Sequence, residues 1–321
     1  MRRLGQLVLL VLVLVLVTGV VFYERPVWMA MQETHFGLFL ARVQSNYVLM
    51  PEGRVHYYEG EASVPGGGIP LVLVHGLADR DESWSPMLKR LKRAGFHVYA
   101  PDLLGYGRSP KPGDSDYSIA TQEQFVADFI QAIGLQKPDI GGWSMGGWIV
   151  LKLALDHPEM VNRVVVYDAA GIAFDGARGN GGMFHPNTPD DVNKLQAMLE
   201  PEAKPLPPFV GRDALRALQE NQAVVDKGVA SMETGKDILD GKLQGMTEPL
   251  LIVWGNLDRL IPLSAGQAMH GMVPASELDV VEGCGHLAPK TCSGRVAAAT
   301  ADFLKAKAAP QGQVRTLTNM R

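Results

Sequence analysis

This chain has little of what metal, redox and nucleic-acid chemistry require. Its 321 residues include only two cysteines and eight histidines, and these are not arranged in clusters of the kind that hold zinc or iron. No glycine-rich loop of the P-loop or dinucleotide-binding type follows a strand-like run. The formal net charge is −4, and the charged residues are scattered rather than gathered into a basic block. We therefore expect no cofactor, no metal and no nucleic-acid partner.

The composition is that of a chain with a full hydrophobic core. Apolar residues make up 46% and charged residues 20% of the sequence, and a chain of this length can bury a single large core. Strand-like runs alternate with helix-like segments, which is typical of an α/β protein with a parallel sheet. We expect an α/β core from residues 47–172 and 247–306, with a mostly parallel, doubly wound sheet.

One long apolar run stands at the N-terminus. Residues 4–23 are mostly Leu and Val, interrupted by Gly5, Gln6, Thr18 and Gly19. About twenty residues at about 1.5 Å each match a hydrocarbon core about 30 Å thick. A signal peptide has a shorter apolar core and a small-x-small cleavage site, and the following TGVVFYER offers no convincing one. We expect residues 1–25 to be an uncleaved transmembrane anchor. Arg2 and Arg3 favour a cytoplasmic N-terminus and place the rest of the chain on the other side (the periplasm in a bacterium), although Arg25 after the span opposes this bias.

The next segment, residues 26–46, mixes apolar and polar side chains. One interpretation is an amphipathic helix at the membrane surface, with Trp28 in the aromatic belt and Phe36 and Phe39 beside it. The other is a helix packed on the folded domain. Both keep the domain close to the bilayer.

Periodicity and turn residues predict the order of elements in the core. Expected strands cover 47–59 (two strands joined at 51–53), 69–74, 97–100, the run ahead of residue 144, 161–168, 249–254 and 278–281. Expected helices cover 84–94, 121–133, 148–155, 262–269 and 296–305.

The alternation stops between residues 173 and 246. This stretch is rich in Gly, Pro and Met, has helical pieces at 190–199 and 212–221, and carries apolar side chains such as Met183 and Phe209. We expect a helical lid (cap) inserted into the core, which would govern substrate choice. Residues 307–321 are expected to be a C-terminal tail, disordered from Pro310 onward.

A serine lies where a strand is expected to turn into a helix. Gly142, Ser144 and Gly146 complete the pattern G-x-S-x-G. The small flanking residues let the serine adopt a strained backbone conformation without clashing with the strand or the helix. Such a pattern also occurs in ordinary glycine-rich turns, but here a strand precedes it and a strong helix former follows it. This setting predicts that Ser144 is a nucleophile.

A serine hydroxyl needs a base, and the base needs a carboxylate to orient it. Asp258 and His286 each follow a late strand, and the chain order Ser, Asp, His is that of one known class of triad. Separately, Asp258 could cap a helix and His286 could sit in a glycine turn. Asp102 is a second candidate carboxylate, but an aspartate in such a glycine-rich loop more often bonds its own turn. We expect Ser144, Asp258 and His286 to be catalytic.

Five motifs in this order make the chain resemble a serine hydrolase of the α/β-hydrolase family over about residues 47–306. They are His75-Gly76-Leu77, the D-x-x-G-x-G-x-S turn at 102–109, the serine elbow, G-x-x-D at 255–258 and G-x-G-H at 283–286. The resemblance implies an α/β-hydrolase fold, an acyl-enzyme mechanism without a cofactor, and an oxyanion hole made by the backbone N–H groups of Leu77 and Met145. The anchor and lid are similar to those of membrane-bound members of the monoacylglycerol-lipase type.

The resemblance implies hydrolysis of a small-molecule carboxylic ester with an apolar acyl chain, by an enzyme held at a lipid membrane. Three alternatives use the same fold. C–C bond hydrolases of ring-cleavage products also have a serine elbow and a lid, but their substrates are soluble and anionic. In perhydrolases and acyltransferases, a molecule other than water removes the acyl group from the acyl-enzyme. Binding proteins of this fold can lack triad residues, whereas this chain lacks none.

The two cysteines, Cys284 and Cys292, flank His286. An oxidising compartment would permit a disulfide that pins the histidine loop to the last helix. Two buried free thiols are the alternative, because sequence does not fix the separation of the two Cα atoms.

Overall fold

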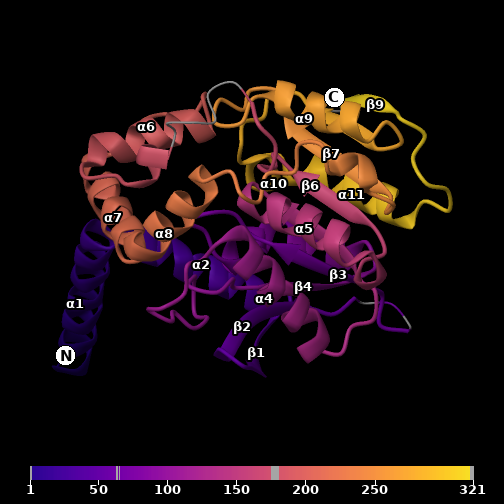
Figure 1. Cartoon of the computed structure of the whole chain (residues 1–321). Coiled ribbons are helices and arrows are strands. Elements are labelled where there is room, and N and C mark those ends of the chain that lie inside the picture. Colours follow the sequence, from indigo (N-terminus) through magenta and orange to yellow (C-terminus); the bar gives the residue numbers. More distant parts are fainter. Residues whose placement is uncertain (1, 63, 65, 175–180, 319–321) are drawn as a thin grey trace.

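Nine strands form one sheet that runs through the molecule (Figure 1). The computed structural model describes residues 2–62, 64, 66–174 and 181–318. Within them the strand order across the sheet is β1-β2-β4-β3-β5-β6-β7-β8-β9. The strands are β1 (Gln44–Met50), β2 (Gly53–Gly60), β3 (Ile69–Val74), β4 (Phe96–Pro101), β5 (Asp139–Trp143), β6 (Val164–Tyr167), β7 (Leu250–Gly255), β8 (Glu277–Val281) and β9 (Val314–Leu317).

The sheet is parallel except at one edge. β1 pairs with β2, and β2 with β4, in the antiparallel sense, whereas all pairings from β4 across to β9 are parallel. The mostly parallel sheet expected from the sequence is therefore confirmed. The carboxyl ends of parallel strands meet along one edge of the sheet, so loops that are far apart in the sequence converge there.

Side chains that alternate along each strand divide the core into two layers. In β3, Leu71 and Leu73 face one layer and Val72 and Val74 the other, and all four are fully buried. Helices cover both faces, as a doubly wound sheet requires. One layer contains α4 (Ile119–Ala132), α5 (Met145–Asp156) and α9 (Leu263–Met272), and the other contains α3 (Ser85–Arg93), α10 (Ala288–Thr291) and α11 (Ser293–Lys305).

The last strand corrects one prediction. The sequence predicts disorder from Pro310 onward, but Val314–Leu317 forms β9 and pairs with β8. Arg315 gives the reason: its Nε and Nη2 atoms donate to the two carboxylate oxygens of Asp279 on β8, at 2.7 and 2.6 Å. Asp279 is fully buried, so a two-point ion pair holds the strand in place. Composition alone does not reveal such a partner.

In the described residues between β6 and β7 there are three helices, where the sequence predicts two helical pieces. They are α6 (Pro189–Leu199), α7 (Pro208–Gln219) and α8 (Gln222–Glu233), and they gather at one side of the sheet (Figure 1). Short 3-10 turns complete the chain: η1 (Asp81–Trp84), η2 (Pro158–Met160), η3 (Gly181–Phe184) and η4 (Leu243–Gly245).

The N-terminal helix α1 (Arg2–Glu24) projects from the body of the molecule (Figure 1). Within residues 3–24, a window of 18 residues has a mean hydropathy of 2.8, and none of this window is buried. It is long and apolar enough to cross a membrane. The following helix α2 (Pro26–Leu40) packs on the folded domain through part of its surface. Leu38 is buried in the domain core, whereas Trp28 and Phe39 remain 45% and 73% exposed.

The inserted helix α7 contacts the end of α1 and the start of α2. Phe209 stacks on Tyr23 with ring centroids 5.4 Å apart. Asp213, which is 3% exposed, accepts a hydrogen bond from the backbone N–H of Val27 at 2.9 Å and lies 3.6 Å from the guanidinium of Arg25. The carboxylate thus caps the N-terminus of α2, where the helix dipole favours negative charge. The inserted segment between β6 and β7 and the apolar N-terminal helix are therefore joined directly.

Cys284 and Cys292 form a disulfide, with Cα atoms 6.4 Å apart. This resolves the alternative that the sequence leaves open. The bridge joins the loop after β8 to the residue that precedes α11. It therefore restrains the segment that carries His286.

Candidate active site

Ser144 occupies a sharp turn between β5 and α5. Its backbone has φ 56° and ψ −118°, a combination that is costly for any residue with a side chain. Its neighbours explain the glycines: a Cβ at Gly142 would come within 2.2 Å of the Gly146 carbonyl oxygen, and one at Gly146 within 2.2 Å of the Val74 oxygen. Strand and helix thus approach too closely for larger residues, as the elbow interpretation requires. The turn lifts the Ser144 side chain out of the sheet and leaves it partly exposed.

His286 and Asp258 are brought together from the ends of β8 and β7. The Nδ1 atom of His286 lies 2.7 Å from Oδ2 of Asp258. The other carboxylate oxygen accepts the backbone N–H groups of Leu260 and Ile261 at 2.8 and 2.9 Å. Both side chains of the pair are almost fully buried. Three donors hold the carboxylate in one orientation, which fixes the imidazole with Nδ1–H toward Asp258.

Two hydrogen bonds to the backbone of His286 hold the histidine loop, one of them from the residue before the elbow serine. The indole N–H of Trp143, next to Ser144 in the chain, donates to the His286 carbonyl at 2.8 Å. From the lid side, the Leu199 carbonyl accepts the His286 backbone N–H at 2.7 Å. No hydrogen bond joins Ser144 Oγ to His286 Nε2 within the described part of the chain. Such contacts often form only when substrate is bound.

The residues expected to form an oxyanion hole lie beside the elbow. Leu77 follows β3 and Met145 is the first residue of α5, and both line the same cavity as Ser144. Gly76 allows the close approach, since a Cβ there would lie 3.1 Å from that of Ser144. In the described residues neither the N–H of Leu77 nor that of Met145 is taken by another hydrogen bond. Two free donors therefore sit next to the serine.

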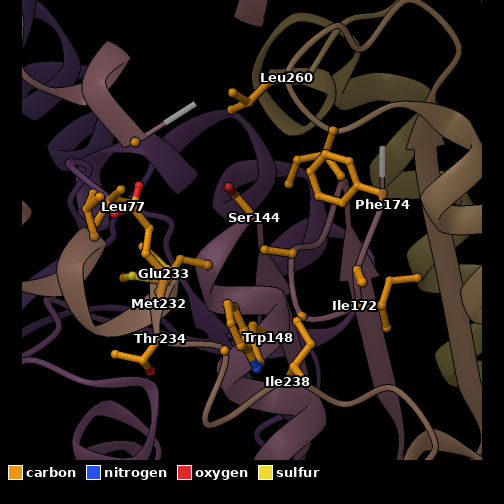
Figure 2. A pocket seen from close by; sticks show the side chains of 18 of the residues that line it. Leu77, Ser144, Trp148, Ile172, Phe174, Met232, Glu233, Thr234, Ile238 and Leu260 are labelled. Carbon is orange, nitrogen blue, oxygen red and sulfur yellow. The ribbon is translucent and has the colours of Figure 1, made fainter. Parts of the chain in front are cut away.

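The cavity in front of Ser144 has a volume of about 740 Å³, within the range of small-molecule sites. Figure 2 shows the Ser144 hydroxyl pointing into it, between Leu77 on one side and Phe174 on the other. Most of the wall is apolar. The wall includes Trp148 from α5, Ile172 and Phe174 after β6, Phe184 from η3, Val229 and Met232 from α8, Ile238, and Leu260 and Ile261 after β7.

Met183 and Phe209, the two residues of the insertion named in the sequence analysis, do not line this cavity. Met183 packs against the core cluster without lining the cavity, and Phe209 stacks on Tyr23 and lies 5.8 Å, centroid to centroid, from Phe22. Phe184, one residue from Met183, does line the cavity. The sequence shows that the insertion carries apolar side chains but does not show which way each one faces.

Sequence reasoning did not single out Asp168 or Glu200 as parts of the site. Burial, and then the charge of Asp258, raise the pKa of Asp168 well above its usual range. Its Oδ1 accepts the Gly255 N–H at 2.7 Å, beneath the loop that carries Asp258. Burial likewise raises the pKa of Glu200, which follows α6 and accepts a hydrogen bond from Thr291 at 3.0 Å. The one available signal was the position of Asp168 at the end of a buried strand.

Asp102 lies outside this group, as its turn motif predicts. It accepts the N–H groups of Arg108 at 2.8 Å and of Asp81 at 3.0 Å. It belongs to a buried cluster with His56 and Asp81, whose ligand-type atoms all lie within 4.8 Å of one another. His56 Nδ1 lies 2.6 Å from Asp81 and its Nε2 lies 2.8 Å from the Ser45 hydroxyl. All three side chains are fully buried and hydrogen-bonded to neighbouring elements, so this cluster supports the fold.

Comparison with known proteins places this geometry in context. Residues 69–291 match the family described as alpha/beta hydrolase fold. The crystal structure of a membrane phospholipase A, described as a bacterial virulence factor, superposes with a TM-score of 0.77 at 28% identity. The match covers 95% of this chain and 98% of that one.

Two curated relatives represent different reactions. A 2-hydroxymuconate semialdehyde hydrolase from Pseudomonas sp. (strain CF600) is 28% identical, over 74% of this chain and 88% of its own length. Lipase 3 from Moraxella sp. (strain TA144) is 26% identical, over 68% of this chain and 72% of its own length. The relatives therefore include a lipase as well as a 2-hydroxymuconate semialdehyde hydrolase.

Proposed function

Since this chain belongs to the α/β-hydrolase family, we propose that it is a serine hydrolase that cleaves carboxylic esters with an apolar acyl chain. The observation that carries the proposal is the oriented Asp258–His286 pair beside a strained serine elbow that opens into an apolar cavity. Strain at a nucleophile persists only where the surroundings enforce it.

The chemistry follows from the geometry in two half-reactions. His286 Nε2 takes the hydroxyl proton while Ser144 Oγ attacks the ester carbonyl carbon. The N–H groups of Leu77 and Met145 stabilise the negative oxygen of the tetrahedral intermediate, each worth about 3 kcal/mol of barrier. Collapse of the intermediate breaks the carbon–oxygen bond, and His286 gives its proton to the leaving alcohol. Water, activated by the same nitrogen, then hydrolyses the acyl-enzyme, and Asp258 stabilises the imidazolium in both halves.

The wall of the cavity favours an ester over an anionic ring-cleavage product. Its charged residues, among those the structure describes, are Glu233 and Asp240, and neither Lys nor Arg is among them. A dienoate substrate brings its own carboxylate, which these acids would repel. The relative that hydrolyses 2-hydroxymuconate semialdehyde keeps the C–C bond reaction as the second candidate.

We place the enzyme at a membrane, held by α1, with its catalytic domain outside the cytoplasm. The exposed apolar helix and the membrane phospholipase A neighbour support the membrane location. The Cys284–Cys292 disulfide supports the side, because such bridges persist in oxidising compartments. The join between α7 and the end of α1 would keep the lid near the bilayer, where an apolar ester dissolves.

A substrate panel tests the proposal. The full-length protein is labelled with a fluorophosphonate and assayed on esters of increasing acyl length and on a dienoate ring-cleavage product. We expect labelling at Ser144 and turnover of esters only. If the protein turned over the dienoate and none of the esters, C–C bond hydrolysis would become the first candidate and ester hydrolysis the second. Phe184→Ala should shift the preferred acyl length, whereas Met183→Ala, off the cavity wall, is the matched control.

A further inference from the structure

We propose that the C-terminal turn of α2 and the cleft beside it bind the acidic headgroup of a bilayer phospholipid and thereby dock the catalytic body onto the membrane. This inference rests on the proposed membrane location and adds a specific lipid site to it. The cleft has a volume of about 710 Å³ and is separate from the cavity at Ser144. Its wall includes His35, Phe39, Arg42, Ser45, Tyr58 and Arg108.

Cations surround this turn on both sides. Arg42 and Arg108 line the cleft, and Arg42 is exposed. On the other side of α2, the ammonium of Lys92 donates to the carbonyls of Ala41 and Arg42 at 3.0 and 2.8 Å. The Lys89 ammonium lies at Gly37, 2.8 Å from where a Cβ would stand. The sequence scatters these charges over three segments, and the fold gathers them around one helix end.

Arg108 is held in place for such a role. Its guanidinium lies 5.1 Å over the ring of buried Tyr58 and donates to the Ser45 hydroxyl at 3.3 Å. Two carboxylates face it: Glu82, which lies 3.3 Å from Arg108 and 2.9 Å from His35, and buried Asp81, which lies 3.8 Å from Arg108. Arg42 has no ion-pair partner in the described part of the chain, so its positive charge remains available at the cleft. Guanidinium groups match phosphate oxygens in geometry as well as in charge.

Apolar side chains of the same turn remain open to solvent. Phe36 is 61%, Phe39 is 73% and Leu40 is 64% exposed. Exposed aromatic and aliphatic residues beside cations are the pattern of a helix lying in the membrane interface. Only Arg25 separates α2 from α1, and the fifteen residues of α2 span about 22 Å. If α2 lies along the bilayer, the headgroup enters the cleft and its acyl chains pass Phe36 and Phe39.

The test uses full-length protein in nanodiscs of ether-linked phosphatidylcholine, with an increasing fraction of ether-linked phosphatidylglycerol. Ether lipids are not substrates of an ester hydrolase. Hydrogen exchange of residues 36–45 reports docking. We expect protection that rises with the acidic lipid in the wild type. Each juxtamembrane cation contributes about fivefold in affinity, so Arg42→Gln should raise the half-maximal lipid fraction about fivefold and Arg42→Gln with Arg108→Gln about thirtyfold.

The matched control is Lys137→Gln with Lys307→Gln, two exposed cations away from α2. It should behave like the wild type. The single variant Arg42→Gln is included because the Arg42 side chain is exposed, so its replacement should leave the fold intact. Equal protection at every lipid composition, or variants that match the wild type, would overturn the proposal. Equal protection by glycerophosphate in solution would overturn the assignment to a lipid.

Turnover of a water-soluble short-chain ester is measured in the same nanodiscs. The Arg42→Gln variant should retain it, because Arg42 lies outside the site at Ser144. In the wild type, an absence of lipid-dependent protection together with normal ester turnover would reject the lipid site alone. Normal protection with no ester turnover in the wild type would reject the proposed reaction alone.

Discussion

Two buried histidines of this protein each face a carboxylate with Nδ1, at almost the same distance. His286 lies 2.7 Å from Asp258 and His56 lies 2.6 Å from Asp81. Around His286 the Nε2 atom has no hydrogen-bond partner among the described residues, and the serine elbow lies nearby. Around His56 the Nε2 atom is engaged by Ser45 at 2.8 Å. A histidine–aspartate pair is therefore a candidate site only when its outer nitrogen is free to act.

The two pairs also differ in how they hold negative charge. Asp258 accepts hydrogen bonds from two backbone N–H groups and from the imidazole, and these three donors stabilise a carboxylate. In the other cluster burial, and then the charge of Asp102, raise the pKa of Asp81 well above its usual range. Burial acts in the same sense on Asp102, but His56 and two backbone N–H groups outweigh it and lower its pKa. The two shifts run in opposite directions, so Asp102 holds negative charge more readily than Asp81 does.

The largest effect should come from removing the nucleophile beside the first pair. Ser144→Ala is expected to lower kcat about a million-fold and to abolish fluorophosphonate labelling, because no other hydroxyl is positioned by the elbow. The fold should persist, since alanine keeps the Cβ that the turn already accommodates. Kinetics and the thermal transition are measured together. Undiminished labelling of this variant would remove Ser144 from its role.

Asp258→Asn should leave the histidine in place but present the wrong tautomer to the serine. We expect kcat to fall about 10⁴-fold with a melting temperature near that of the wild type. Steady-state kinetics at saturating ester and a melting curve check this. A normal kcat would show that another carboxylate orients His286, with Asp168 the first to test.

Asp102→Asn should have the opposite profile. The substitution removes a buried carboxylate, and the new amide N–H faces one of the two backbone N–H groups that Asp102 now accepts. The free energy of unfolding should therefore fall by about 3 kcal/mol. Turnover per folded molecule should stay close to that of the wild type. Denaturant titration and active-site counting separate the two quantities. If this variant folded normally but lost turnover, the roles of the two aspartates would be reversed.

The disulfide gives the first pair a restraint that the second lacks. The double variant Cys284→Ser, Cys292→Ser removes a bridge between residues eight positions apart in the sequence. In the chain-entropy view, this loss should lower the free energy of unfolding by about 2–3 kcal/mol. We expect a lower melting temperature, and a larger relative loss of kcat than of KM as the His286 loop loosens. Mass spectrometry of unreduced, alkylated wild-type protein provides the check, since two alkylated thiols would contradict the bridge.

The smallest effect is a pH dependence confined to the second pair. The raised pKa of Asp81 contributes stability that is fully present below its ordinary value of 3.8 and is lost as pH rises through the folded-state pKa. Asp81→Asn imitates the protonated form at every pH. Its melting temperature relative to the wild type should therefore rise by a few degrees from acid to neutral pH. A difference that shrinks over this range would contradict the raised pKa of Asp81.

The sequence by itself determined the alternation of strands and helices, the elbow at Ser144 and the placement of Asp258 and His286 after late strands. These features are local: periodicity, glycine spacing and chain order fix them. It also predicted the long apolar helix at the N-terminus, which follows from length and composition.

Only the tertiary structure decided which groups meet. Whether Cys284 and Cys292 bridge depends on a distance between loops. The strand at Val314–Leu317 depends on an ion pair with β8. The direction of Phe209 toward α1, and the gathering of cations around α2, depend on how helices pack. Contacts between residues distant in sequence are set by long-range packing, and no local pattern of residue types encodes them.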